Sequence, residues 1–261
     1  MRILSSQPLV FVQDSNSSST LIDEIEEPSD PPALVLKYLD DDLLNTSAAQ
    51  RLTRLKIKYV ARKTLEALKA LHEDNYVYSD IKPDNVLVNY GQGDICFTDI
   101  QLADCRNTVR VNSVFAKHRD IIGAPIWRSP EAQLQIGWGT ATDIWSFGTM
   151  LITLIWGGNW FIFKSDVLAD HESYELKILI KQHQFFGLLS LSYKEIADDQ
   201  TLAILTYVMY GVPPEKMKPF VRVTEREISE DKAFVLKIMK LDPKNRPTAK
   251  ELLEDEWFMP G

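Results

Sequence analysis

The sequence is poor in cysteine and histidine. Cys96 and Cys105 are the only cysteines among 261 residues, which excludes a disulfide framework and favours a reducing compartment. The four histidines are scattered, and none of their spacings suits a metal site. These shortages exclude the small disulfide-stapled secreted domain and the histidine-ligated metal centre.

The sequence also lacks a long uninterrupted apolar run. Its most apolar stretch, residues 144–163, is interrupted by Ser146 and Gly148 and is broken by Gly157 and Gly158. A run of this kind predicts a buried core helix and no membrane span. The first four residues lack the apolar core of a secretory signal. We therefore expect an intracellular protein, in the cytoplasm or the nucleus, with no membrane partner.

Charge and composition are those of a globular protein with an acidic balance. Lysine and arginine number 29 against 37 aspartates and glutamates, which gives a net charge of −8. This balance argues against nucleic acid as a partner. With 45% hydrophobic and 25% charged residues, the chain has the composition and length for one large domain or two small ones.

The residue pattern divides the chain into a short β part and a long helical part. Residues 1–20 are polar and of low complexity toward their end, so we expect poor order there. The expected strands, in chain order, are 21–25, 33–39, 76–78, 86–88 and 94–98. Apolar spacing predicts a helix over 47–72 and mostly helices after Pro130. Thr248 and Glu251 have the spacing of a capping box.

The stretch from Tyr78 to Asn85 places an acid, a cation and an amide at spacings that suit phosphoryl transfer. That chemistry needs an acid to orient a hydroxyl, a cation to stabilise charge, and oxygen ligands for Mg²⁺. Asp80 would orient the hydroxyl, Lys82 would meet the transferring phosphate, and Asn85 would offer an oxygen to the metal. An ordinary polar loop between two strands stays open as the alternative, because these residue types also populate turns.

A second acid, Asp99, follows Asp80 by nineteen positions. Two short strands joined by a tight turn at Gly91 and Gly93 would bring the two loops side by side. Asn85 and Asp99 would then share Mg²⁺, a hard cation that prefers oxygen ligands. The alternative is that Asp99 only ends a strand.

Five separated segments resemble motifs of the C-terminal lobe of eukaryotic protein kinases. Residues 78–85 resemble the catalytic loop, and residues 99–101 resemble the Asp-Phe-Gly magnesium motif. Ser129-Pro130-Glu131 resembles the Ala-Pro-Glu motif, and residues 143–148 resemble the start of the central apolar helix. Arg246 stands where the family places the partner of the Pro-Glu carboxylate, so an ion pair with Glu131 is implied.

The resemblance runs from about residue 21 to residue 258 and implies an α+β fold. The expected organisation is a remnant of the small β lobe with the hinge at 21–39, and a mostly helical C-terminal lobe at 40–261. Asp143 would brace the catalytic loop, with a helix N-cap as the alternative role. Departures at Ser79 and Gln101, where the family usually has arginine and glycine, point toward weaker activity without deciding it.

The resemblance also implies ATP and Mg²⁺ as cofactors and a protein hydroxyl as the substrate, since Lys82 and the Pro-Glu segment are both present. It assigns catalysis to Asp80, Lys82 and Asn85 and metal binding to Asn85 and Asp99. The nucleotide contacts that it implies are the gatekeeper Leu36, the hinge residues Lys37, Tyr38 and Leu39, the ribose contact Asp42, and the pocket floor Leu87.

The match fails before Leu36, where the sequence has no glycine-rich loop and no Val-Ala-x-Lys strand. Because these elements hold phosphates, three readings stay open: a serine/threonine protein kinase, a pseudokinase or binding module without catalysis, and an incomplete copy of a longer kinase. A two-stranded remnant is marginal by itself and has open edges. We therefore expect a partner protein that completes or covers it.

Overall fold

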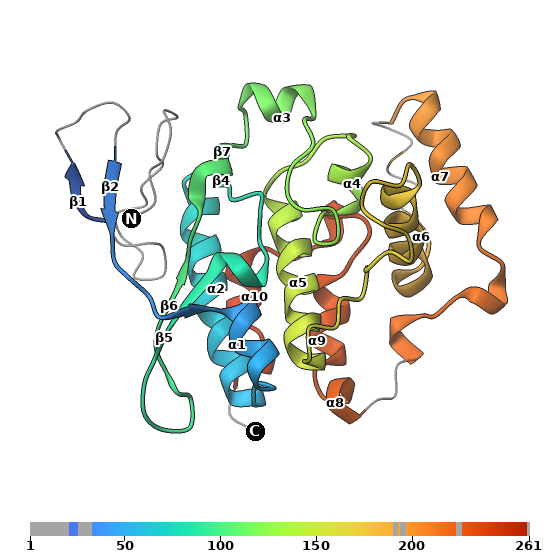
Figure 1. Cartoon of the computed structure of the whole chain (residues 1–261). Coiled ribbons are helices and arrows are strands. Elements are labelled where there is room, and N and C mark those ends of the chain that lie inside the picture. The colour runs from blue at the N-terminus through green and yellow to red at the C-terminus, as the bar shows by residue number, and fades with distance from the viewer. Residues whose placement is uncertain (1–20, 26–32, 190–192, 194–196, 223–225, 260–261) are drawn as a thin grey trace.

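The computed structural model describes residues 21–25, 33–189, 193, 197–222 and 226–259; the predicted poor order at 1–20 lies outside the described residues. The described part is α+β, with small antiparallel sheets at one side and helices over the rest of the molecule (Figure 1). This fold class is the one that the sequence predicts.

The strands of the described residues form three small sheets. β1 (Leu21–Ile25) pairs with β2 (Ala33–Leu36), and this hairpin stands at the edge of the molecule in Figure 1. The three-stranded sheet contains β3 (Asp41–Asp42), β5 (Val86–Tyr90) and β6 (Phe97–Leu102). The third sheet pairs β4 (Tyr76–Val77) with β7 (Val109–Arg110).

Two strand predictions differ from the structure. The strand expected over 33–39 ends at Leu36, and the strand expected over 94–98 lies instead at Phe97–Leu102. The second difference has a local cause, because the turn before β6 takes residues 91–96. It is closed by the bond from the Gly91 amide to the Cys96 carbonyl, at 2.7 Å, and it uses left-handed backbone at Gly93 and Cys96.

The helices of the described part surround one large core, and a small second cluster lies beside it. In chain order they are α1 (Leu43–Ala49), α2 (Arg54–Glu73), α3 (Val114–His118), α4 (Pro130–Gln133), α5 (Thr140–Trp156), α6 (Tyr174–Phe186), α7 (Asp199–Gly211), α8 (Arg226–Ser229), α9 (Lys232–Ile238) and α10 (Ala249–Leu253). The prediction of one continuous helix over 47–72 is therefore wrong, because α1 ends at Ala49 and α2 begins at Arg54. Thr53 caps a new helix, since its side chain accepts from the Lys56 amide.

α5 is the central helix of the core, as Figure 1 shows, and residues 142–155 are all buried. The apolar run is thus a core helix, as predicted, up to Trp156; the helix ends there, before residues 157–163. A side chain at Gly148 would lie 2.5 Å from Met239 Sδ and 2.6 Å from Ile238 Cγ2, so α9 packs directly on the α5 backbone. Among the described residues, no helix has the length and apolar character to cross a membrane.

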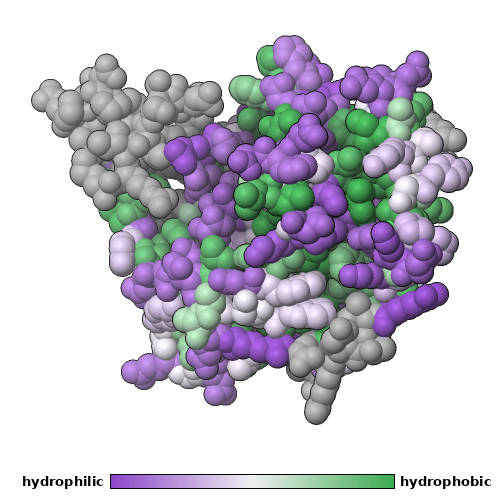
Figure 2. Space-filling model, turned by 45° about the vertical axis from the view of Figure 1, so that its right-hand side comes forward, coloured by the Kyte–Doolittle hydropathy of each residue, from purple (hydrophilic) through white to green (hydrophobic). Residues whose placement is uncertain are grey.

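The last helix begins as its sequence predicts. The Thr248 side chain accepts from the Glu251 amide, and the Glu251 carboxylate accepts from the Thr248 amide, which is a complete capping box. On the face in Figure 2, hydrophilic and hydrophobic residues interleave over most of the surface.

Candidate functional site

The loop between β4 and β5 brings three predicted residues together. Lys82 Nζ lies 3.0 Å from Asp80 Oδ2. Asn85 Nδ2 donates to the Asp80 carbonyl at 2.8 Å and to Asp80 Oδ2 at 3.0 Å. Pro83–Asn85 form a 3-10 turn that leads directly into β5, so Asn85 lies immediately before the strand. The acid, the cation and the amide therefore share one small cluster.

The backbone of this loop is held by Asp143, which is fully buried in the first turn of α5. Its carboxylate accepts from the amides of Tyr78 and Ser79, at 2.8 Å each, and lies 2.9 Å from His72 Nε2. The bracing role expected for Asp143 is confirmed. The alternative of a helix N-cap is wrong, because Gly139 occupies that position.

Ser79 has φ +74°, an uncommon conformation for a residue with a side chain. Its Oγ donates to the Asn107 carbonyl at 2.8 Å. Gly123 packs against it so closely that a Cβ there would lie 2.7 Å from the Ser79 carbonyl oxygen. The next amide, of Ala124, donates to Asp80 Oδ1 at 3.3 Å. The segment around 107–124 thus fits closely over the loop at 78–85.

The charge of Lys82 is set by its two acidic neighbours. Burial lowers the pKa of Lys82, but hydrogen bonds and charge interactions with Asp80 and Asp84 outweigh burial and raise it. Lys82 Nζ lies 3.6 Å from Asp84 Oδ2. The lysine is therefore cationic at neutral pH, and it lies beside the carboxylate expected to orient a hydroxyl.

The structure does not bring Asp99 to this cluster. Asp99 lies within β6, opposite Asn89 in β5. Asn89 is four residues along the chain from Asn85, so Asp99 lies well away from Asn85 along the sheet. Its Oδ2 accepts from Lys37 Nζ at 2.7 Å and from Gln101 Nε2 at 2.8 Å. The alternative that Asp99 ends a strand is also wrong, because β6 continues to Leu102.

The acid that does follow the strand is Asp104, which the sequence analysis missed. The Ala103 amide donates to the Asn85 carbonyl at 2.9 Å, so Ala103 lies opposite Asn85 and Asp104 comes next. Asp104 has φ +52°, and the chain turns there into the 3-10 turn Cys105–Asn107. The residue pattern carries no signal for it, because the turn at 91–96 displaces the strand end from 98 to 102 and the pattern does not determine that turn.

Tyr78 links the loop at 78–85 to this turn. Its hydroxyl donates to the Ala103 carbonyl oxygen. Burial raises the pKa of Tyr78 well above its usual value, and the charges of Asp80 and Asp104 raise it further. The hydroxyl is therefore a permanent donor, and both carboxylates lie close enough to act on it.

The residues predicted to contact a nucleotide lie in two groups. Leu36, Lys37 and Tyr38 are exposed, whereas Leu39 is buried. Asp42 and Leu87 are paired across β3 and β5, and Leu87 is half-buried. The Asp42 carboxylate caps α1 by accepting from the Asn45 amide at 2.8 Å.

The internal ion pair expected between Glu131 and Arg246 is confirmed. Arg246 Nη1 and Nη2 donate to the two Glu131 oxygens at 2.6 and 2.7 Å, and both side chains are buried. Arg246 also donates to the carbonyls of Lys240 and Ala141. All three nitrogen atoms of this buried guanidinium group donate hydrogen bonds within the fold, so the pair is structural.

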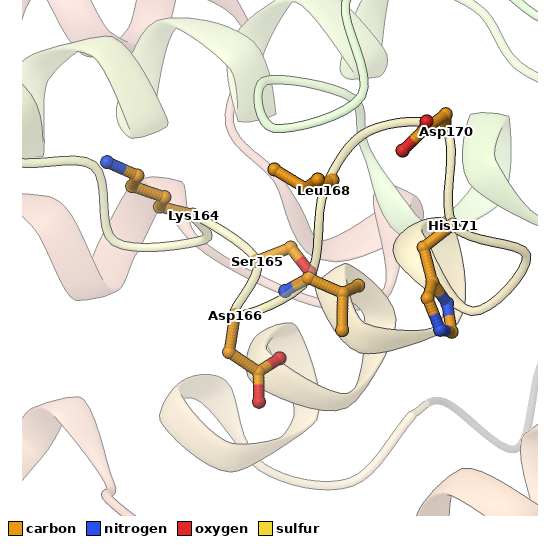
Figure 3. A pocket seen from close by; sticks show the side chains of 7 residues that line it. Lys164, Ser165, Asp166, Leu168, Asp170 and His171 are labelled. Atoms are coloured by element: carbon orange, nitrogen blue, oxygen red, sulfur yellow. The ribbon is translucent and has the colours of Figure 1, made fainter.

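Outside this site, a surface hollow lies in the connection between α5 and α6 (Figure 3). It is lined by residues of the segment 164–171, including Asp166, Asp170 and the exposed Leu168. None of the predicted site residues lines it. Among the described residues, no group of three or more histidine, cysteine, aspartate or glutamate side chains is placed to hold a metal ion.

Comparisons with known proteins identify the family of the chain. A family model described as "Protein kinase domain" matches residues 14–258. Over 125 residues the chain is 32% identical to the serine/threonine-protein kinase shk1/pak1 of Schizosaccharomyces pombe and 36% identical to the serine/threonine-protein kinase STE20 of Saccharomyces cerevisiae. These matches cover 48% of the chain but only 18% and 13% of the two relatives, so it spans less than a fifth of their length. The chain belongs to the protein kinase family, and the relatives that it resembles are of the serine/threonine type.

Proposed function

We propose that the chain transfers the γ-phosphoryl group of ATP to a serine or threonine hydroxyl of a protein. The observation that carries this proposal is the cluster of Asp80, Lys82 and Asn85 on a braced loop. Asp80 accepts the hydroxyl proton and orients the oxygen toward phosphorus, while Lys82 lies beside it to stabilise the charge on the transferring group. Both side chains already have defined positions, which lowers the cost of organising them.

The metal ligands in this proposal are Asn85 and Asp104, in place of the predicted pair Asn85 and Asp99. The Asn85 amide nitrogen faces Asp80, which leaves its oxygen for a cation. Asp104 supplies a carboxylate just beyond the residue that pairs with Asn85. This donor set of oxygens suits Mg²⁺, which supplies charge neutralisation on phosphate oxygens when bound. Metal binding by Asp99 stays a prediction, and none of its contacts supports it.

The nucleotide-binding part of the proposal follows the sequence prediction. Residues 21–39 form the small-lobe remnant and hinge, and residues 40–261 form the large lobe. Leu36 is the gatekeeper, the hinge residues 37–39 contact adenine, Asp42 faces the ribose and Leu87 lies under the base. A partner protein covers or extends the β1–β2 hairpin, whose two strands pair only with each other within the described part of the chain.

The test is phosphorylation of a protein substrate, such as casein, by the chain with labelled ATP and Mg²⁺. Asp80→Asn should lower the rate by about 10²–10⁴, because it removes the acid that orients the hydroxyl. Asp94→Asn is the matched control, since Asp94 is exposed in the turn before β6, and it should keep the wild-type rate. Equal rates in wild type and Asp80→Asn would reject the proposal.

A second candidate, a binding module without catalysis, is favoured by one observation. Arg106 holds both carboxylate oxygens of Asp104, the acid proposed for the metal. Calorimetry with Mg²⁺ and ATP separates the two candidates. Heat that disappears in Asp104→Asn favours the kinase, and absence of binding by the wild-type chain favours the binding module.

A further inference from the structure

The carboxylate of Asp104 is held by a cation of the chain itself. Arg106 Nε donates to Asp104 Oδ1 at 2.7 Å, and Arg106 Nη2 donates to Oδ2 at 3.0 Å. This two-point pairing engages both oxygens, which are the atoms that a divalent cation would bind. The guanidinium group therefore lies where a metal ion would have to approach the acid.

The surroundings explain why this acid pairs with an internal cation. Asp104 and Asp80 both act electrostatically on the buried hydroxyl of Tyr78, so two negative charges lie near each other. Lys82 is engaged with Asp80. Arg106 then supplies the compensating charge at Asp104, and this pairing raises the pKa of Arg106.

The two partners differ in how readily they can move. The Arg106 side chain is 57% exposed, whereas the Asp104 side chain is 21% exposed. Asp104 is also fixed by its left-handed backbone and by the neighbouring bond between the Ala103 amide and the Asn85 carbonyl. Because the guanidinium group is exposed, water and dissolved salt compete for its charge. The arginine can therefore leave while the acid stays in place.

We propose that Arg106 is an internal competitor of the divalent cation, so that metal binds at Asn85 and Asp104 only after the guanidinium group has left Asp104. This inference rests on the proposed function, because it takes Asp104 as the metal-binding acid. It assigns Arg106 a role in setting metal affinity, and hence in holding the nucleotide site inactive at low metal concentration.

The test measures Mn²⁺ affinity by electron paramagnetic resonance on the full chain, with and without ADP. Arg106→Met removes the charge and keeps an unbranched side chain, and it should bind Mn²⁺ roughly threefold to tenfold more tightly than wild type. Arg106→Lys keeps a charge without the two-point geometry and should fall between them. Arg110→Met is the matched control, because this guanidinium lies over the Tyr76 ring, and it should leave Mn²⁺ affinity unchanged.

The outcomes separate this inference from the proposed function. Loss of the gain in the double variant Arg106→Met with Asp104→Asn supports the competition. Unchanged or weaker Mn²⁺ binding in Arg106→Met, with binding lost in Asp104→Asn, overturns the competition and leaves the metal site intact. Binding by Arg106→Met alone supports the competition and counts against catalysis by the natural chain. No Mn²⁺ binding by wild type or any variant overturns both.

Discussion

Lys37 and Asp99 form an ion pair, with 2.7 Å between Nζ and Oδ2, that joins the segment after β2 to the middle of β6. Gln101 holds the same carboxylate oxygen at 2.8 Å. Directly opposite Asp99 in β5, the Asn89 side chain accepts from the Asp40 amide at 3.0 Å. These contacts fasten the chain after β2 to the β5–β6 hairpin, and they give Asp99 a structural partner.

The first prediction follows from this pair. Lys37→Met and Asp99→Asn should both speed hydrogen exchange of the amides at 33–39, each by the equivalent of about 0.2–1 kcal/mol, as for exposed pairs. The double variant should add little, because both changes remove one interaction. Mass spectrometry of exchanged peptides measures this. A Mg²⁺ dependence changed by Asp99→Asn and not by Lys37→Met would return Asp99 to the metal site.

The comparison of Asp99 with Asp104 shows what the sequence could and could not predict. Asp80, Lys82 and Asn85 lie close together in the sequence, within the loop at 78–85. Their clustering in space was therefore predictable. The level of an acid on the neighbouring strand depends on the turn between the strands. The turn at 91–96 is longer than the sequence suggests, and it shifts the register of every β6 residue against β5. A residue pattern does not determine the length of that turn.

Helical parts were predictable for a different reason. The burial of α5 follows from a run of apolar residues, and the capping box of α10 follows from two residues three positions apart. The break before α2 was missed, because apolar residues continue through it while Thr53 caps a new helix. Ion pairs such as Arg106 with Asp104 depend on side-chain positions that local sequence does not determine.

The second prediction concerns the buried pair of Glu131 and Arg246. Arg246→Met should lower the free energy of unfolding by about 3–5 kcal/mol, because it leaves the Glu131 carboxylate buried without its partner. Urea denaturation followed by circular dichroism measures the change. Lys250→Met is the control, since Lys250 is exposed on α10 and should shift stability by less than about 0.5 kcal/mol. Equal shifts in both variants would contradict a structural role for the pair.

The third prediction concerns the brace under the catalytic loop. Asp143→Ala removes the acceptor of the Tyr78 and Ser79 amides and should cost about 1.5–3 kcal/mol or more of stability, since hydrogen bonds to a charged group are lost. Those two amides should also exchange faster than the amides of α2. Asp94→Ala, in an exposed turn, serves as the control. Protection at residues 78 and 79 that survives in Asp143→Ala would show that another group holds the loop.

The fourth prediction concerns phosphorylation of the segment that covers the catalytic loop. Ser79 stands where related kinases carry the arginine that reads a phosphate, and its hydroxyl is already bonded to the Asn107 carbonyl. Thr108 is buried, whereas Ser113 caps α3 and is half-buried. Because the segment is held without a phosphate, Ser113→Asp and Ser113→Ala should both keep phosphorylation of casein within about twofold of wild type. Asp80→Asn in the same assay checks that the measured rate belongs to the chain. A rise of tenfold or more in Ser113→Asp alone would mean that a negative charge at this position does organise the site, through basic residues other than the one at the usual position.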